Sequence, residues 1–226
     1  VRRRACVRAF ARRGDDILNR MEYLYRSMLL SRPSRSGHRF KRRVHLGPWR
    51  EEFTLPNGRR VLLRPIVPED ARALREGFGT LSAEEVRMRF LHPLNELSED
   101  MARKLTHVDP ARGIALVVAE PLPPGEALIG AVARISLGAV GHEAEFALLV
   151  ARPLAGQGLG TYLMRRLIQW CARRRVTLLY GDVLNENRAM LKLTGNLGFE
   201  HLHLPGDQGL TRVRRVFGDP KRRRKP

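Results

Sequence analysis

The feature of this sequence that most constrains its fold is the segment 143–164, where a hydrophobic strand pattern runs directly into a glycine-rich turn and then into an amphipathic helix. The turn contains Gly156, Gly158 and Gly160. Glycine lets the backbone approach a ligand closely and point successive N–H groups at it, and the start of the following helix adds a partial positive charge. Such a unit is typical of an α/β fold with a diphosphate-binding turn.

The glycine spacing excludes two common nucleotide-binding loops. A P-loop needs a Gly-Lys-Ser/Thr sequence, which the turn lacks, and a G-x-G-x-x-G motif needs a third glycine where this chain has Thr161. Two interpretations remain from the residues alone. The turn binds the diphosphate of another kind of ligand, or it is a glycine-rich connection between a strand and a helix with no ligand.

Hydrophobic periodicity along the rest of the chain predicts one mixed α/β domain, with a central mixed sheet flanked by helices. Helix starts are indicated at Pro68, at Ser82 with Glu85 in a capping box, and at Ser98. The expected strands are 60–66, 114–120, 128–136, 143–150, 177–184, 199–204 and 210–217, and the expected helices are 68–78, 82–90, 98–105, 160–175 and 187–197.

The formal net charge of +19 is concentrated at the two ends of the chain. Residues 1–50 contain 15 Lys/Arg and 3 Asp/Glu, and residues 212–226 contain 8 and 1, whereas residues 51–211 contain 19 of each. The central region is therefore neutral, and its activity does not require a polyanion. The basic ends are candidates for binding an acidic surface or nucleic acid.

Composition divides the chain into three parts. Residues 1–48 are expected to form a basic arm, an amphipathic helix and a linker, residues 49–217 the α/β domain, and residues 218–226 a basic tail. The amphipathic pattern runs from Ile17 to Leu29. This helix packs on its own core, binds a partner or lies on a membrane surface, and the sequence leaves these alternatives open.

Cysteine content and hydropathy restrict the compartment. The chain has two cysteines, Cys6 and Cys171, which are too few for a disulfide framework or a four-ligand zinc site. No apolar run approaches the roughly 18 residues that a membrane-spanning helix needs. We therefore expect a cytoplasmic protein with no transmembrane segment and no metal ion, and the oligomeric state is unknown.

The glycine-rich segment resembles motif A of the GNAT superfamily, the acyl-CoA-dependent N-acyltransferases, whose turn reads Gln/Arg-x-x-Gly-x-Gly/Ala. Gly158 and Gly160 occupy the glycine positions, Gln157 precedes them, and Ala155 stands at the first Gln/Arg position. The resemblance covers roughly residues 50–217. It implies a GNAT fold and acetyl-CoA as the acyl donor, with its pyrophosphate on the turn.

A second segment resembles the other signature of this superfamily, in which an asparagine is followed by a helix and then by Leu-Gly-Phe. Asn187 and residues 197–199 match it. Members often have a tyrosine seven residues after the asparagine as the general acid for the departing thiolate, and Thr194 occupies that position here. The resemblance therefore implies that water or the returning base protonates the thiolate.

Four further segments look similar to the catalytic domain of bacterial protein lysine acetyltransferases of the Pat type. They are Leu-Arg-Pro-Ile-Val-Pro-Glu-Asp at 63–70, Arg-Phe-Leu-His-Pro-Leu at 89–94, Leu-Thr-His-Val-Asp at 105–109 and Ala-Glu-Phe-Ala-Leu-Leu-Val-Ala at 144–151. This similarity implies that a protein lysine attacks the thioester directly in a ternary complex.

The reaction requires a neutral amine, whereas a lysine amine with a reference pKa of about 10.4 is almost wholly charged at pH 7. A nearby carboxylate can accept its proton. Glu143 and Glu145 lie two residues apart on the expected strand and so share one face. The Pat resemblance assigns the base to Glu145, and the alternative for both residues is an ordinary polar strand face.

The resemblance also implies which residues contact acetyl-CoA. The N–H groups of Leu148, Leu149 and Val150 would hold the pantetheine arm and face the thioester oxygen, as in an oxyanion hole. The other expected contacts come from the turn and the second signature, and they are Gln157, Gly158, Leu159, Gly160, Thr161 and Asn187.

Other candidate groups are weaker. His201 and His203 share one face of a short strand and form a potential metal pair, but no carboxylate or cysteine cluster accompanies them. His92 and His107 are isolated and are expected to be structural. Cys171 falls on the apolar stripe of a helix, where a buried, inert thiol is expected.

We therefore expect an acetyl-CoA-dependent N-acetyltransferase that modifies a protein lysine, and two alternatives stay open. The first is acetylation of a small amine, because the acceptor groove is the part of this fold that sequence reveals least. The second is a weakly catalytic CoA-binding protein whose basic tails bind nucleic acid, which the departures at Ala155 and Thr194 favour.

Overall fold

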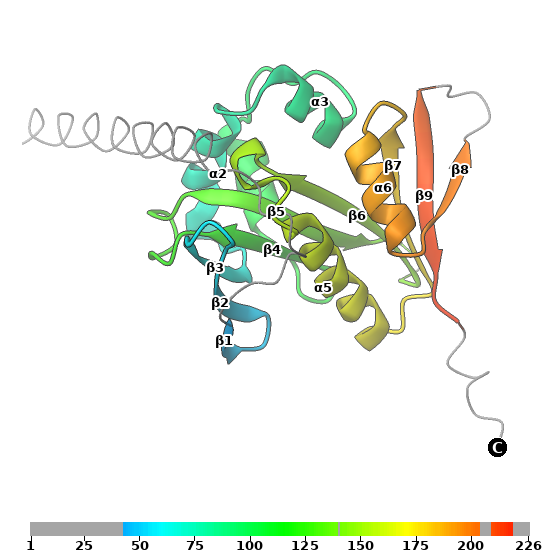
Figure 1. Cartoon of the computed structure of the whole chain (residues 1–226), viewed down its shortest axis with the longest axis horizontal. Helices are drawn as coiled ribbons and strands as arrows, with labels where there is room; N and C mark the ends of the chain where they lie inside the picture. The colour runs from blue at the N-terminus through cyan, green and yellow to red at the C-terminus, as the bar shows by residue number, and fades with distance from the viewer. Residues whose placement is uncertain (1–42, 140, 204–208, 219–226) are drawn as a thin grey trace, which may run out of the picture.

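The computed structural model describes residues 43–139, 141–203 and 209–218, so the expected amphipathic helix and most of the basic tail lie outside the described residues. The described strands form one nine-stranded sheet in the order β1-β2-β3-β4-β5-β6-β7-β9-β8, with helices on both faces (Figure 1). This confirms the expected mixed α/β class with a central sheet flanked by helices. No described helix has the length and hydropathy needed to cross a membrane.

Every strand and helix expected between residues 60 and 217 is present, with ends shifted by no more than two or three residues. The strands are β1 (Arg43–Gly47), β2 (Arg50–Thr54), β3 (Arg60–Pro65), β4 (Gly113–Ala119), β5 (Ile129–Leu137), β6 (Glu143–Val150), β7 (Leu178–Leu184), β8 (Glu200–His203) and β9 (Leu210–Val216). The helices are α2 (Ala71–Phe78), α3 (Ala83–Phe90), α4 (Glu99–Thr106), α5 (Leu159–Arg173) and α6 (Arg188–Asn196), with short 3-10 turns η1 (Pro68–Asp70) and η2 (Arg152–Leu154).

The hairpin of β1 and β2 was not expected from the sequence. The two strands pair antiparallel, and Trp49 at their turn has a φ of 60°. The side chain of Glu51 points inward and is 1% exposed, because the Tyr162 hydroxyl and Arg166 of α5 bind its carboxylate. Because Glu51 is charged, β2 lacks the alternation of polar and apolar residues that would predict a strand. β1 lies before residue 49, where the sequence places the start of the α/β domain. The boundaries of the three expected parts stay a prediction.

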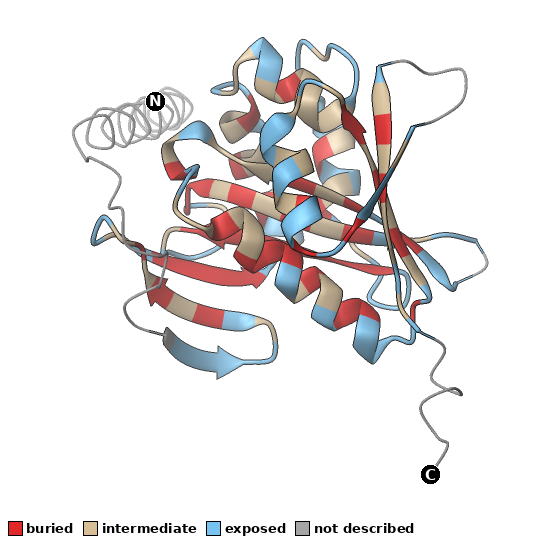
Figure 2. Ribbon diagram, turned by 45° about the vertical axis from the view of Figure 1, so that its right-hand side comes forward, coloured by how far each residue is buried: buried red, intermediate tan, exposed pale blue. Residues whose placement is uncertain are grey.

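The core lies on both faces of β4, which is buried along its whole length. Ile114, Leu116 and Val118 face the cluster that includes α5, while the alternate residues of the strand face α2. Figure 2 shows this concentration of buried residues in the central strands and on the inner side of α5. β5 and β6 therefore belong to a sheet that is covered on both faces by helices.

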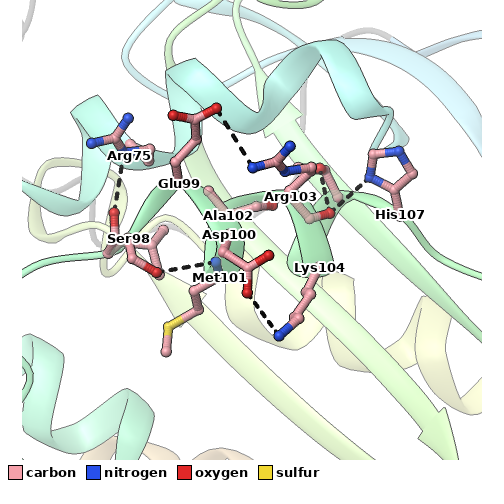
Figure 3. Close-up of polar contacts among 11 residues, drawn as sticks. Arg75, Ser98, Glu99, Asp100, Met101, Ala102, Arg103, Lys104 and His107 are labelled. Carbon is pink, nitrogen blue, oxygen red and sulfur yellow. Dashed lines mark hydrogen bonds and ion pairs between the residues drawn. The ribbon is translucent and has the colours of Figure 1, made fainter.

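The α4 helix, which covers part of one face, is fixed by local polar contacts (Figure 3). The Ser98 hydroxyl accepts a hydrogen bond of 3.2 Å from the Met101 N–H and caps the helix start. Along the exposed side, Glu99 pairs with Arg103 and Asp100 with Lys104 at i,i+4 spacing. The apolar side of α4 is therefore left to pack toward α2 and the sheet.

Candidate active site

The candidate site begins where β6 and β7 separate. The two strands run parallel and pair only over Glu143–Glu145 and Leu178–Tyr180, after which β7 continues against β9. The Ala151 N–H donates to the Gly130 carbonyl of β5, so by strand alternation the Leu149 N–H also points toward β5. The N–H groups of Leu148 and Val150 consequently point into the gap, where none of the described strands receives them.

The turn after β6 presents further N–H groups. Gly156 and Gly158 have φ angles of 74° and 83°, a left-handed conformation that glycine adopts without strain. Gly158 is the N-cap of α5 and no side chain caps this end, while the first hydrogen bond of the helix runs from the Tyr162 N–H to the Gly158 carbonyl. The N–H groups of Leu159, Gly160 and Thr161 precede that bond, so they remain available to an anion at the positive end of the helix dipole.

The gap and the turn open into one cleft of about 610 Å³. The expected cofactor-contacting residues that line it are Leu148, Leu149, Val150, Gly158, Leu159, Gly160, Thr161 and Asn187. Gly160 leaves room for the side chain of Leu193 of α6, because a β-carbon there would lie 2.8 Å from Leu193 Cδ1. A diphosphate, followed by an amide-bearing chain along β6, fits this set of donors.

Gln157 is the one expected cofactor-contacting residue that does not line the cleft. Its side-chain amide donates to the Pro153 carbonyl at 3.3 Å, and its side-chain oxygen is buried without a hydrogen bond among the described residues. Gln157 therefore contacts the backbone before the turn and does not face the cleft. Asn187 caps α6, because its side-chain oxygen accepts the Met190 N–H at 3.0 Å.

Comparison with known proteins identifies this arrangement. Residues 60–200 match the family described as the acetyltransferase (GNAT) domain. The chain is also 31% identical over 154 residues to the acetyltransferase PA5475 of Pseudomonas aeruginosa, covering 68% of this chain and 82% of that relative.

The chain belongs to the GNAT acetyltransferase family. It is therefore an acetyl-CoA-dependent N-acetyltransferase.

Solved structures agree with the GNAT fold. The GNAT domain of S. lividans PAT aligns with a TM-score of 0.66 at 24% identity, covering 77% of this chain and 100% of that one. Spermidine N-acetyltransferase from Vibrio cholerae, solved with CoA and spermine, aligns with a TM-score of 0.56 at 17% identity, covering 69% and 95%. At these identities the likeness shows the fold alone.

In the GNAT framework Glu145 lies at the last paired position of β6, next to Tyr180 of β7, just before the strands separate. Its side chain is exposed, on the face opposite to Phe146 and the α5 core, and it does not line the cleft itself. Burial raises the pKa of the Tyr180 hydroxyl, and the negative charge of Glu145 is the next cause. The expected base thus stands beside the gap, on the side of the sheet that carries α3 and α4.

Thr194 does not replace the GNAT tyrosine acid. It is 0% exposed and absent from the cleft lining. Its hydroxyl lies 2.9 Å from the Met190 carbonyl and 3.0 Å from Nε2 of His201. His201 is thereby held by Thr194, and within the described residues no group of three or more His, Cys, Asp or Glu side chains could hold a metal ion.

Sequence reasoning missed two arginines on the side of the sheet that carries α3 and α4. Arg89 near the end of α3 and Arg134 of β5 line a second cavity of about 60 Å³ between α2, α3, α4 and the sheet. Arg89 also lines the main cleft. They are 45 positions apart in a chain with many arginines, so no local pattern singles them out.

Proposed function

We propose that the protein transfers the acetyl group of acetyl-CoA to the side-chain amine of a protein lysine, with Glu145 as the general base. The observation that carries the proposal is the position of the exposed Glu145 carboxylate, at the point where β6 and β7 stop pairing and the donor cleft begins. A carboxylate at that point can reach an amine that approaches the gap from the α3 side of the sheet.

Different groups of the chain bind the donor and transfer the protons. The N-terminus of α5 and the turn bind the diphosphate of the donor substrate, and the Leu148 and Val150 N–H groups hydrogen-bond its amide arm and polarise the thioester carbonyl. Glu145 takes one proton from the ammonium of the acceptor, directly or through water. The neutral amine attacks the carbonyl carbon, the carbon–sulfur bond breaks, and the thiolate regains a proton from water or from Glu145.

A small amine is the second candidate acceptor. The observation that favours it is the cavity of about 60 Å³ beside the cleft, which is lined by α2, α3, α4 and the sheet and has room for a small group. To test this, the protein is incubated with acetyl-CoA and a panel of proteins, and acetylated lysines are identified by mass spectrometry. Their rates of acetylation are compared with those of a panel of free amines. Modified lysines with efficiencies above those of every free amine support the protein acceptor.

The role of Glu145 is tested with Glu145→Gln, and Glu143→Gln is the matched control because Glu143 is also exposed and lies two residues away on the same face. We expect Glu145→Gln to lower kcat about 100-fold or more at pH 7.5 with unchanged acetyl-CoA affinity. The defect should shrink as the pH approaches 10, because the acceptor amine then becomes neutral without a base. A defect that does not depend on pH, or an equal loss in Glu143→Gln, would contradict the assignment.

A further inference from the structure

The cavity beside the donor cleft combines an apolar wall with two positive charges. Its lining includes Leu74, Phe78, Phe90, Leu105, Ile129 and Leu149, together with Arg89 and Arg134. A volume of about 60 Å³ holds several water molecules or a carboxylate. Two guanidinium groups in such a cavity are costly unless an anion accompanies them.

The protein itself provides little compensation for these charges. Arg134 donates to the Leu105 carbonyl at 3.0 Å, while its Nε is buried without a hydrogen-bond partner in the described part of the chain. Arg89 lies 4.9 Å from the ring centre of Phe90 and forms no ion pair within residues 43–139, 141–203 and 209–218. Burial lowers the pKa of Arg89 to about 10, repulsion from Arg134 adds to this, and Glu145 opposes it.

Several other acids of this side of the molecule are already engaged. Glu85 accepts the N–H groups of Ser82 and Arg152. Glu99 and Asp100 pair with the basic residues of their own helix (Figure 3). Asp70 binds Arg64 through two hydrogen bonds of 2.6 and 2.8 Å. Among the described carboxylates, Glu145 is the one whose charge acts on Arg89.

The position of the pair relates it to the acceptor. Arg134 is the cross-strand partner of Ala147, which lies between Glu145 and Leu149 on the same face of β6. Arg89 and Leu149 line both the small cavity and the main cleft. A molecule whose amine lies at Glu145 can therefore place a second group between the two guanidinium groups.

We propose that Arg89 and Arg134 bind a carboxylate of the acceptor substrate, close to the amine that is acetylated. This inference rests on the proposed function, since it specifies the chemistry of the acceptor. The carboxylate belongs either to a free amino acid or to an acidic residue beside the acceptor lysine of a protein. The shared requirement is an amine and a carboxylate in one acceptor.

The test compares acceptors that differ only in the carboxylate. Lysine is compared with lysinamide, and a tripeptide with glutamate before lysine is compared with the same peptide carrying glutamine. For the wild type we expect kcat/KM to favour the carboxylate by about 10- to 100-fold in at least one pair, because charged hydrogen bonds are lost in the neutral member. The pair that shows the preference identifies the source of the carboxylate, and equal efficiencies in both pairs overturn the proposal.

Variants assign the preference to the two arginines. Arg89→Gln and Arg134→Gln should remove it, mainly by raising KM for the carboxylate acceptor, while Arg165→Gln on the exposed side of α5 removes one charge without this effect. Arg89→Lys keeps the charge and should retain part of the preference. A loss of acetyl-CoA affinity in Arg89→Gln with an unchanged acceptor preference would assign Arg89 to the donor and overturn the proposal.

A binding experiment separates this inference from the proposed function. Butyrate and butyramide carry no amine, and their binding is followed by ligand-observed NMR on the folded full-length protein. We expect the wild type and Arg165→Gln to bind butyrate in preference to butyramide, and Arg89→Gln to lose this preference. No binding of butyrate overturns the carboxylate site. Butyrate binding without acetylation of any amine supports the site and removes the proposed function alone.

Discussion

At the scale of single residues, Cys171 shows how enclosure changes acid–base behaviour. It lies on the inner side of α5 and is 0% exposed, and burial raises the pKa of its thiol from 9.0 to about 12. Above pH 9 the unfolded chain loses this proton while the folded chain keeps it. Folding is then coupled to proton uptake, so stability must fall as the pH rises through this range.

We therefore expect the free energy of unfolding to fall between pH 9 and pH 11 more steeply in the wild type than in Cys171→Ala, by up to about 1.4 kcal/mol per pH unit. Urea unfolding of both proteins at pH 8, 9.5 and 10.5 measures the difference. Parallel curves would show that the thiol titrates alike in both states.

Thr161 offers a test of the donor site that does not depend on destabilising the fold. It lies in the first turn of α5, where an acidic side chain is favourable to the helix but repels a bound diphosphate. Thr161→Asp should weaken acetyl-CoA binding at least tenfold in calorimetric titration without lowering Tm, and the neutral Thr161→Asn should bind almost as well as the wild type. Equal affinities of the two variants would place the diphosphate elsewhere.

At the scale of elements, α3 connects the two sides of the site. Its Ser82 and Glu85 form a capping box, Glu85 also accepts the Arg152 N–H at 3.1 Å, and Arg87 forms an ion pair with Glu186 at the rim of the cleft. The helix is thereby tied both to the beginning of the glycine-rich turn and to the loop before α6. Movement of α3 would change the donor cleft and the arginine-lined cavity together.

Removing the N-cap of α3 measures how much the start of this helix contributes to stability. Ser82→Ala should lower the unfolding free energy by about 1 kcal/mol, because the Glu85 N–H loses its partner. Ser136→Ala, at an exposed position of β5, is the control and should change stability by less than half of that. Chemical denaturation decides, and a neutral Ser82→Ala would mean that the α3 start is held by its tertiary contacts alone.

The same elements show which structure is predictable from sequence. Ser82, Ser98 and the glycines of the turn act on neighbours within a few residues, so their helix starts were found correctly. Glu51 was not identified as inward-facing, because its partners Tyr162 and Arg166 are more than 100 positions away. Arg89 and Arg134 were missed because they lie on separate elements, 45 positions apart. Local chemistry is visible in a sequence, whereas compensation between distant elements appears only after folding.

At the scale of the whole molecule, charge and catalysis are separated along the chain. The cleft and Glu145 lie within the neutral residues 51–211, and the excess of positive charge lies in the terminal segments. Deletion of residues 1–42 and 219–226 should leave the acetyl-CoA affinity and kcat within about twofold, since the described lining of the cleft lies between residues 84 and 193. It should abolish salt-sensitive retention on heparin, because that depends on clustered Lys and Arg. Loss of turnover on deletion would make the termini part of the acceptor site.

Deuterium uptake offers a direct view of the separation between β6 and β7. Amide hydrogens in central strands exchange slowly. Those of Leu148 and Val150 face none of the described strands and should exchange rapidly, while the Leu149 amide between them stays protected by β5. The centre of the sheet would thus carry an alternating pattern of protection. A donor that occupies the gap should slow the exposed amides and leave their neighbours unchanged, so that binding is recorded residue by residue along one strand.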